Sequence, residues 1–104
     1  MSAVALLDTG LIYKNPKPHV HSVHGYFPSV AYLGDQHMVA TVVLAEAFEA
    51  ADARTQLCRS TDLGRTWELE APLAQAVPGR LLSDSSRITA LSRNDLVAFM
   101  VRCD

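Results

Sequence analysis

The sequence has no apolar run that approaches the roughly 20 residues a helix needs to cross a bilayer. It also has no cluster of lysine or arginine, and its nine basic and eleven acidic side chains give a formal charge of −2. Such a balance offers no surface that could follow a phosphate backbone. We therefore expect neither a membrane nor a nucleic acid as a partner.

Signals for export and for metal binding are also missing. The opening MSAVALLDTG has no basic n-region and reaches Asp8 too early to supply a secretory h-region, so we predict a cytoplasmic protein. The two cysteines, Cys58 and Cys103, do not form a CxxC pair. In HVHSVH (19–24) His19 and His21 share one face of an extended chain while His24 points to the other, and no fourth ligand is spaced to join them. We predict neither a metal nor a cofactor.

The sequence does have many short apolar or alternating segments separated by turn residues, which is typical of an all-β fold. Its 104 residues suffice for one small domain. Residues 44–53 are rich in helix formers, and we interpret them as the end of a strand followed by a long loop that can be partly helical. We predict strands over residues 4–8, 11–15, 27–33, 37–45, 55–60, 66–71, 86–91 and 96–101.

The chain is similar to itself at a spacing of 58 residues: PSVAYLGDQHMVATVV (28–43) aligns with SRITALSRNDLVAFMV (86–101). Four positions are identical, namely Leu33 and Leu91, Val39 and Val97, Ala40 and Ala98, and Val43 and Val101. We predict a repeated strand-turn-strand unit. The first copy continues into two more strands, which makes a four-stranded meander, whereas the second copy stops after its second strand.

The segment STDLGRTW (60–67) must reverse the chain between two predicted strands. Asp62 can accept hydrogen bonds from backbone amides ahead of it. Gly64 can adopt a positive φ. The hydroxyls of Ser60 and Thr66 can tie the two ends of the turn, and Trp67 can cover it. We predict that these five side chains lock a hairpin.

This segment also resembles the Asp-box, or BNR repeat, S/T-x-D-x-G-x-T-W/F, of sialidases and related β-propeller proteins. The resemblance implies a sialidase-like β-propeller, of which the chain holds one complete four-stranded blade and about half of the next. It divides the chain into a leading segment (1–25) that is a candidate ring-closing strand, a first blade (26–72) with the Asp-box at 60–67, a linker (73–83) and the start of a second blade (84–104). The remaining blades would come from a longer chain or from self-association.

The same resemblance implies where chemistry would lie, because in that family the first strand of each blade lines a central channel. It implies a glycosidase-like hydrolase that acts on a terminal sugar, with a glycan or small sugar as its partner. The implied catalytic carboxylates are Glu46, Glu49, Asp52 and Asp84, the implied substrate-binding residues are His24, Tyr26, Arg87 and Arg102, and Asp104 lies near the same channel. The Asp-box itself is a structural clasp in that family, away from the pocket.

Alternatives stay open at each of these positions. The family's Arg-Ile-Pro segment is replaced by Tyr26-Phe27-Pro28, so the first arginine of its carboxylate-binding cluster is absent. This departure favours a noncatalytic glycan- or protein-binding propeller, and a third alternative is an inactive truncated fragment. Arg87, which lies near Asp84 in the sequence, can instead form a salt bridge within the propeller wall, and the acid-rich loop can simply be solvated.

Overall fold

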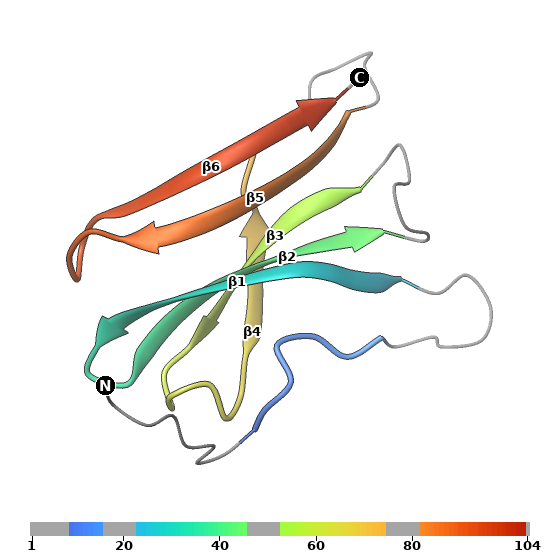
Figure 1. Ribbon diagram of the computed structural model, residues 1–104. Helices are drawn as coiled ribbons and strands as arrows, with labels where there is room; N and C mark the ends of the chain where they lie inside the picture. The colour runs from blue at the N-terminus through green and yellow to red at the C-terminus, as the bar shows by residue number, and fades with distance from the viewer. Residues whose placement is uncertain (1–8, 16–22, 46–52, 75–81, 104) are drawn as a thin grey trace, which may run out of the picture.

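The computed structural model describes residues 9–15, 23–45, 53–74 and 82–103, and this part of the chain contains strands and no helix (Figure 1). The strands are β1 (His24–Gly34), β2 (His37–Ala45), β3 (Arg54–Ser60), β4 (Glu68–Pro72), β5 (Ser83–Ala90) and β6 (Leu96–Cys103). A four-stranded antiparallel sheet has the order β1-β2-β3-β4, and β5 pairs with β6 in a separate hairpin. The predicted all-β class and the four-stranded meander are confirmed.

Six of the predicted strands are present, with ends that move by up to three residues. The prediction of a strand over 11–15 is wrong, because this segment pairs with no described strand. The segment is instead held by its side chains: Ile12 packs against Ala40, Val42 and Cys58, and the Tyr13 hydroxyl donates to the carbonyl of Val23 at 2.8 Å. The predicted strand 4–8 lies outside the described residues.

The β5–β6 hairpin lies over one face of the four-stranded sheet, and β5 makes the contact (Figure 1). Ile88 of β5 packs against Ala31 of β1 and Val39 of β2 in a small apolar cluster. The hydroxyl of Ser29 accepts a hydrogen bond from the backbone amide of Ile88 at 3.0 Å. The packing is therefore sheet on sheet, with β5 above β1 and β2.

The strand pairing repeats at the spacing predicted from the sequence. Ala31 pairs with Val39 in the first hairpin, and the residues 58 positions later, Thr89 and Val97, pair in the second. The turns correspond as well, since Arg93 is equivalent to Asp35 and the two form an ion pair at 2.6 Å. The repeated strand-turn-strand unit is confirmed by this register.

The pairing of the first hairpin is interrupted twice, between Tyr26 and Ser29 and between Tyr32 and Gly34, whereas β5 and β6 pair without a register shift. The first interruption is a β-bulge in β1. The register shifts between Tyr26 and Ser29, and Phe27 within the bulge has a φ of 51°. A one-residue shift turns the following side chains to the opposite face of a strand. Tyr26 consequently packs on the cluster of Val43, Ala45 and Ala53.

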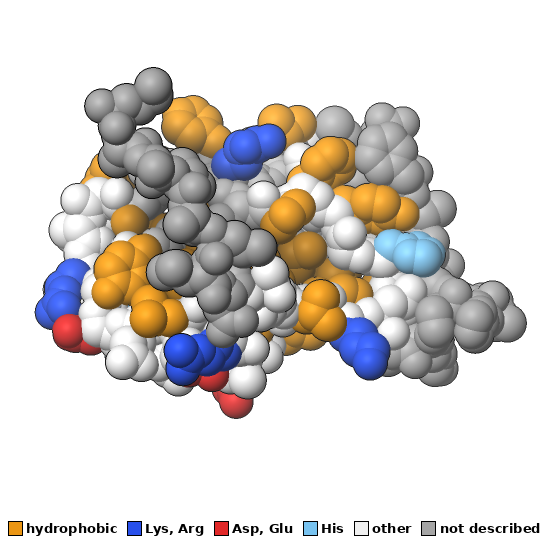
Figure 2. Space-filling model, turned by 60° about the horizontal axis from the view of Figure 1, so that its bottom comes forward, with side chains coloured by type: hydrophobic (Ala, Val, Ile, Leu, Met, Phe, Trp, Pro, Cys, Tyr) orange, Lys and Arg blue, Asp and Glu red, His pale blue; other side chains and the backbone are white. Residues whose placement is uncertain are grey.

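The opposite face of the sheet carries residues 10–15 and the Asp62–Gly64 turn. A Cβ on Gly10 would lie 2.3 Å from the carbonyl oxygen of Gly64, so only glycine allows this approach. Apolar side chains remain visible on this side between white polar and backbone atoms (Figure 2). Among the described residues there is no helix with the length and apolarity that a bilayer crossing requires.

Candidate functional site

The turn between β3 and β4 is locked by the five side chains that the sequence predicts. Asp62 accepts from the backbone amide of Thr66 at 2.9 Å and from its hydroxyl at 2.5 Å. The hydroxyl of Ser60 donates to Asp62 at 2.8 Å and accepts from the amide of Gly64 at 2.8 Å. Gly64 has a φ of 84°, and the indole of Trp67 donates to the carbonyl of Gly64 at 2.9 Å. The predicted hairpin lock is confirmed.

These bonds favour the charged form of the Asp62 carboxyl. The Thr66 hydroxyl, the Thr66 backbone amide and then the Ser60 hydroxyl lower the pKa of Asp62 from 3.8 to about 2. Because Thr66 and Trp67 take part in the turn, β4 begins at Glu68 and not at Thr66 as predicted. The site is therefore a structural clasp, and its donors are engaged within the turn.

A groove of about 430 Å³ runs along the free edge of β1, between this strand and residues 10–15. Its lining includes Tyr13, Asn15, His24 and Tyr26. The Asn15 amide nitrogen lies 3.4 Å from Nδ1 of His24, and the ring centroids of His24 and Tyr26 are 6.2 Å apart. The structure thus brings two of the predicted substrate-binding residues, His24 and Tyr26, into one groove. We call these four side chains the edge groove.

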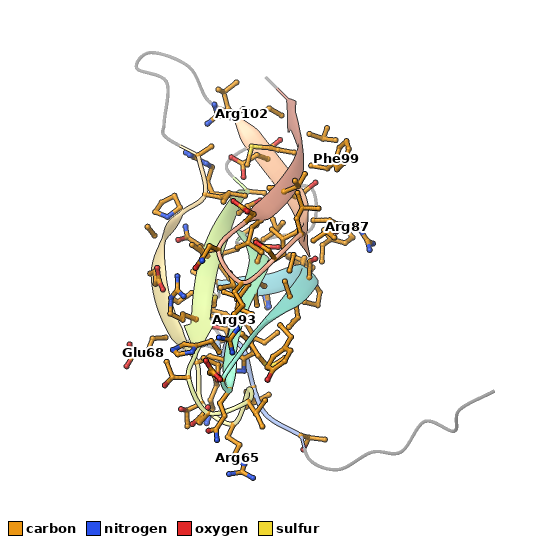
Figure 3. The ribbon with its side chains drawn as sticks, turned by 90° about the vertical axis from the view of Figure 1, so that its left-hand side faces the viewer. Arg65, Glu68, Arg87, Arg93, Phe99 and Arg102 are labelled. Carbon is orange, nitrogen blue, oxygen red and sulfur yellow. The ribbon has the colours of Figure 1, made fainter. Side chains whose placement is uncertain are left out.

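The predicted site arginines lie elsewhere. Arg87 faces a hollow of about 300 Å³ that is also lined by Phe27, Phe99 and Val101. Arg87 and Phe99 project on the same side of the molecule, from the paired positions on β5 and β6 (Figure 3). Among the described residues Arg87 forms no ion pair, and Asp84 is paired with Arg54 and Arg102 instead, so the alternative of a salt bridge from Arg87 is not seen in this part of the chain. Strand alternation explains this, because residues 84 and 87 point to opposite faces.

Asp84 is held in a different way, between the two sheets. Its side chain is 1% exposed, and its carboxylate accepts from the backbone amide of Thr55 at 2.6 Å and from Nε of Arg54 at 3.0 Å. Nε of Arg102 lies 3.8 Å from the same carboxylate. The catalytic role of Asp84 and the substrate-binding role of Arg102 stay predictions, but this geometry favours a structural clamp.

The other predicted carboxylates, Glu46, Glu49, Asp52 and Asp104, lie outside the described residues. The first three are flanked in the sequence by Ala45, the last residue of β2, and by Ala53, which precedes β3. Both alanines belong to the cluster on which Tyr26 packs. Among the described residues, no three His, Cys, Asp or Glu side chains are grouped so as to hold a metal ion.

Sequence reasoning missed Tyr13 and Asn15. The resemblance assigns residues 1–25 to a leading segment with a candidate ring-closing strand, and this assignment predicts no contact with β1. The available signal was the pair of polar side chains in LIYKN, which alternation places away from Ile12 and Lys14. Comparison with protein-family models, with curated proteins and with solved structures finds no match to this chain.

Proposed function

We propose that this protein is a carbohydrate-binding, sialidase-like β-propeller protein that holds a sugar in the edge groove. The observation that carries the proposal is the composition of the groove: two tyrosines, an amide and an imidazole around a volume of about 430 Å³. Aromatic faces pack against the C–H face of a sugar ring, while amide and imidazole nitrogens bond its hydroxyls. Pockets of this size with few polar groups are typical of small-ligand sites.

The groove favours a neutral sugar over a sialate. A sialate carboxylate is best bound by an arginine fork, and no arginine lines the described groove. Arg87 lies in the separate hollow with Phe27 and Phe99. The position of the missing family arginine is Tyr26, whose ring suits stacking.

Titration calorimetry with a panel of neutral monosaccharides and disaccharides, and with N-acetylneuraminic acid, tests this proposal. We expect a neutral sugar to bind, and His24→Ala or Asn15→Ala to weaken binding about fivefold to tenfold, since each removes one hydrogen-bonding group. His37→Ala is the matched control, because His37 is an exposed histidine at the opposite end of the first hairpin. Heat signals that are absent across the panel, or equal for His24→Ala and His37→Ala, would contradict the proposal.

The propeller part of the proposal is supported by the meander, by the turn lock and by the second hairpin stacked on the sheet. A ring of such units places β1 toward its centre, which is where the edge groove opens. Small-angle X-ray scattering of the longest natural chain tests it. A closed ring gives a distance distribution with a depleted centre, and a compact sandwich without that depletion would argue against a propeller.

Glycoside hydrolysis is a second candidate, favoured by one observation. The acid-rich segment 46–52 is flanked in the sequence by Ala45 and Ala53, and these two alanines pack with Tyr26. A glycosidase uses a pair of carboxylates. Chromogenic glycosides test this activity: turnover that is lost in Glu46→Gln, Glu49→Gln or Asp52→Asn would support it, and a protein that binds sugar without turnover would leave binding alone.

A further inference from the structure

The face of the β5–β6 hairpin that points away from the four-stranded sheet carries exposed apolar side chains from β6 beside Ser85, Arg87 and Thr89 from β5, and no described strand covers it. Strand alternation places Val97, Phe99 and Val101 on this face, opposite to Ile88, and Phe99 is 81% exposed. No described strand pairs with the outer edge of β5 or β6. We call these three residues the acceptor face.

The repeat indicates which kind of surface can bind the acceptor face. Val97 and Val101 are the equivalents of Val39 and Val43 in the first hairpin. Val39 is buried because Ile88 of β5 packs on it. The acceptor face therefore corresponds to a surface that, one repeat earlier, is already covered by a strand of this same chain.

β5, the strand that covers Val39, is equivalent to β1 in the repeat, and the corresponding side chains of β1 are exposed. Ile88 and Ala90 of β5 correspond to Val30 and Tyr32 of β1, by the register that the two hairpins share. Val30 is 43% exposed and Tyr32 is 56% exposed. One chain thus carries both halves of a second interface, and no strand in the described part of the chain covers either half. We call Val30 and Tyr32 the donor face.

We propose that a second copy of this chain binds here, with its donor face on the acceptor face of the first copy. Val30 of one copy then packs on Val97 of the other, as Ile88 packs on Val39 within the chain. The contact is heterologous, because each copy offers a different surface and keeps one half open for another copy. This proposal depends on the repeat and is independent of sugar binding in the edge groove.

The intermolecular contact lacks two bonds that hold the intramolecular one. The equivalent of Asp84 is Tyr26, so the carboxylate clamp to Thr55 has no counterpart. Arg87 replaces Ser29, whose hydroxyl bonds the backbone of Ile88. The interface is mainly apolar, and we expect it to depend on concentration and to be insensitive to moderate salt.

Sedimentation velocity of the full chain from low micromolar to several hundred micromolar tests the proposal. We expect the wild type to shift to larger species as concentration rises. Phe99→Asp places a charge on the acceptor face, and Val30→Asp places one on the donor face. Each variant keeps only one functional half of the interface, so each variant alone should remain monomeric. Mixed together, the two variants should form one-to-one dimers and nothing larger, because each retains one intact half.

Leu69→Asp is the control, since Leu69 is an equally apolar, half-exposed residue on β4, away from both faces. It should associate like the wild type. Circular dichroism verifies that each variant is folded, and Tyr32→Asp replaces Val30→Asp if the latter unfolds. A wild type that is monomeric at every concentration, a Phe99→Asp protein that still associates, or a mixture that fails to dimerise would each overturn the proposal.

Discussion

The backbone amide of Thr55 donates a 2.6 Å hydrogen bond to Oδ1 of Asp84, and this bond joins strands of two different sheets. The other carboxylate oxygen of Asp84 accepts from Arg54, next to Thr55 on β3. A nearby backbone bond, from the amide of Asp84 to the carbonyl of Ala53 at 2.8 Å, supports the same junction. Asp84 is thus the main polar link between the sheet and the β5–β6 hairpin.

We expect Asp84→Asn to lower the free energy of unfolding by about 3 kcal/mol, because it leaves Arg54 without its buried anion. Asp35→Asn is the matched control, since its ion pair with Arg93 is exposed and should contribute less than about 1 kcal/mol. Urea unfolding followed by tryptophan fluorescence measures both. Equal losses in the two variants would show that burial of Asp84 does not matter.

The Ser60 hydroxyl is the buried centre of the β3–β4 turn. It donates to Asp62 and accepts from the amides of Asp62 and Gly64. Ser60→Ala should destabilise the fold by about 2 kcal/mol, because the half-buried amides of Asp62 and Gly64 lose their acceptor. Ser92→Ala is the control: Ser92 makes similar bonds, to Asp95 and Asn94, in an exposed turn. If Ser92→Ala costs as much in thermal unfolding, burial does not explain the effect of Ser60.

The pKa of Asp62 predicts how stability changes in acid. The folded state lowers this pKa to about 2 from 3.8. A lowered carboxyl pKa contributes stability that is fully present above the unfolded value and is lost as pH falls through the folded value. The contribution should therefore disappear between about pH 4 and about pH 2. Urea midpoints measured across this range should fall more steeply for the wild type than for Asp62→Asn.

Glu68→Gln gives the corresponding control for this pH dependence. Glu68 is an exposed carboxyl in the first position of β4, close in sequence to the turn. Its removal should leave the acid slope of the wild type intact. An Asp62→Asn protein with the wild-type slope would show that other carboxyls dominate between pH 4 and pH 2.

The turn and the repeat could be predicted because their determinants are local. Ser60, Asp62 and Thr66 lie within seven residues, and their side chains reach only their own turn. The repeat is visible because apolar and polar residues alternate in the same way in the two hairpins. This alternation also determines which face of the strand each residue occupies. These parts of the fold required no knowledge of distant contacts.

The edge groove and the Asp84 clamp could not be predicted in the same way. The clamp joins Asp84 to Arg54, 30 residues earlier, and nothing local to either residue indicates the other. The groove depends on a bulge in which Phe27 has a φ of 51°, a conformation that aromatic side chains disfavour. Propensity predicts an unbroken strand there, and unbroken alternation would place Tyr26 on the wrong face.

The alkylation rate of Cys58 measures how often the apolar cluster around this thiol opens. The thiol is buried, and burial, followed by the charge of Glu70, raises the pKa of Cys58. Only the thiolate reacts with alkylating reagents. In a Cys103→Ser background we expect iodoacetamide to label Cys58 at least about a hundredfold more slowly in native buffer than in denaturant. Labelling at similar rates would show that the Ala40–Val42–Cys58 cluster opens readily.

Leu63 should be a site where a substitution stabilises the protein. Its φ is 59°, which is unfavourable for leucine, and it is 53% exposed at the tip of the β3–β4 turn. Asparagine tolerates this left-handed conformation and keeps the backbone amide, which donates to the carbonyl of Gln36 at 3.0 Å. Leu63→Asn should therefore raise the free energy of unfolding by about 1 kcal/mol.

Leu69→Asn is the control for this prediction. Leu69 is 50% exposed in β4, where the strand conformation carries no such strain, so asparagine should be neutral or destabilising there. Urea unfolding that ranks Leu63→Asn at or below Leu69→Asn would mean that the leucine backbone at position 63 carries no strain.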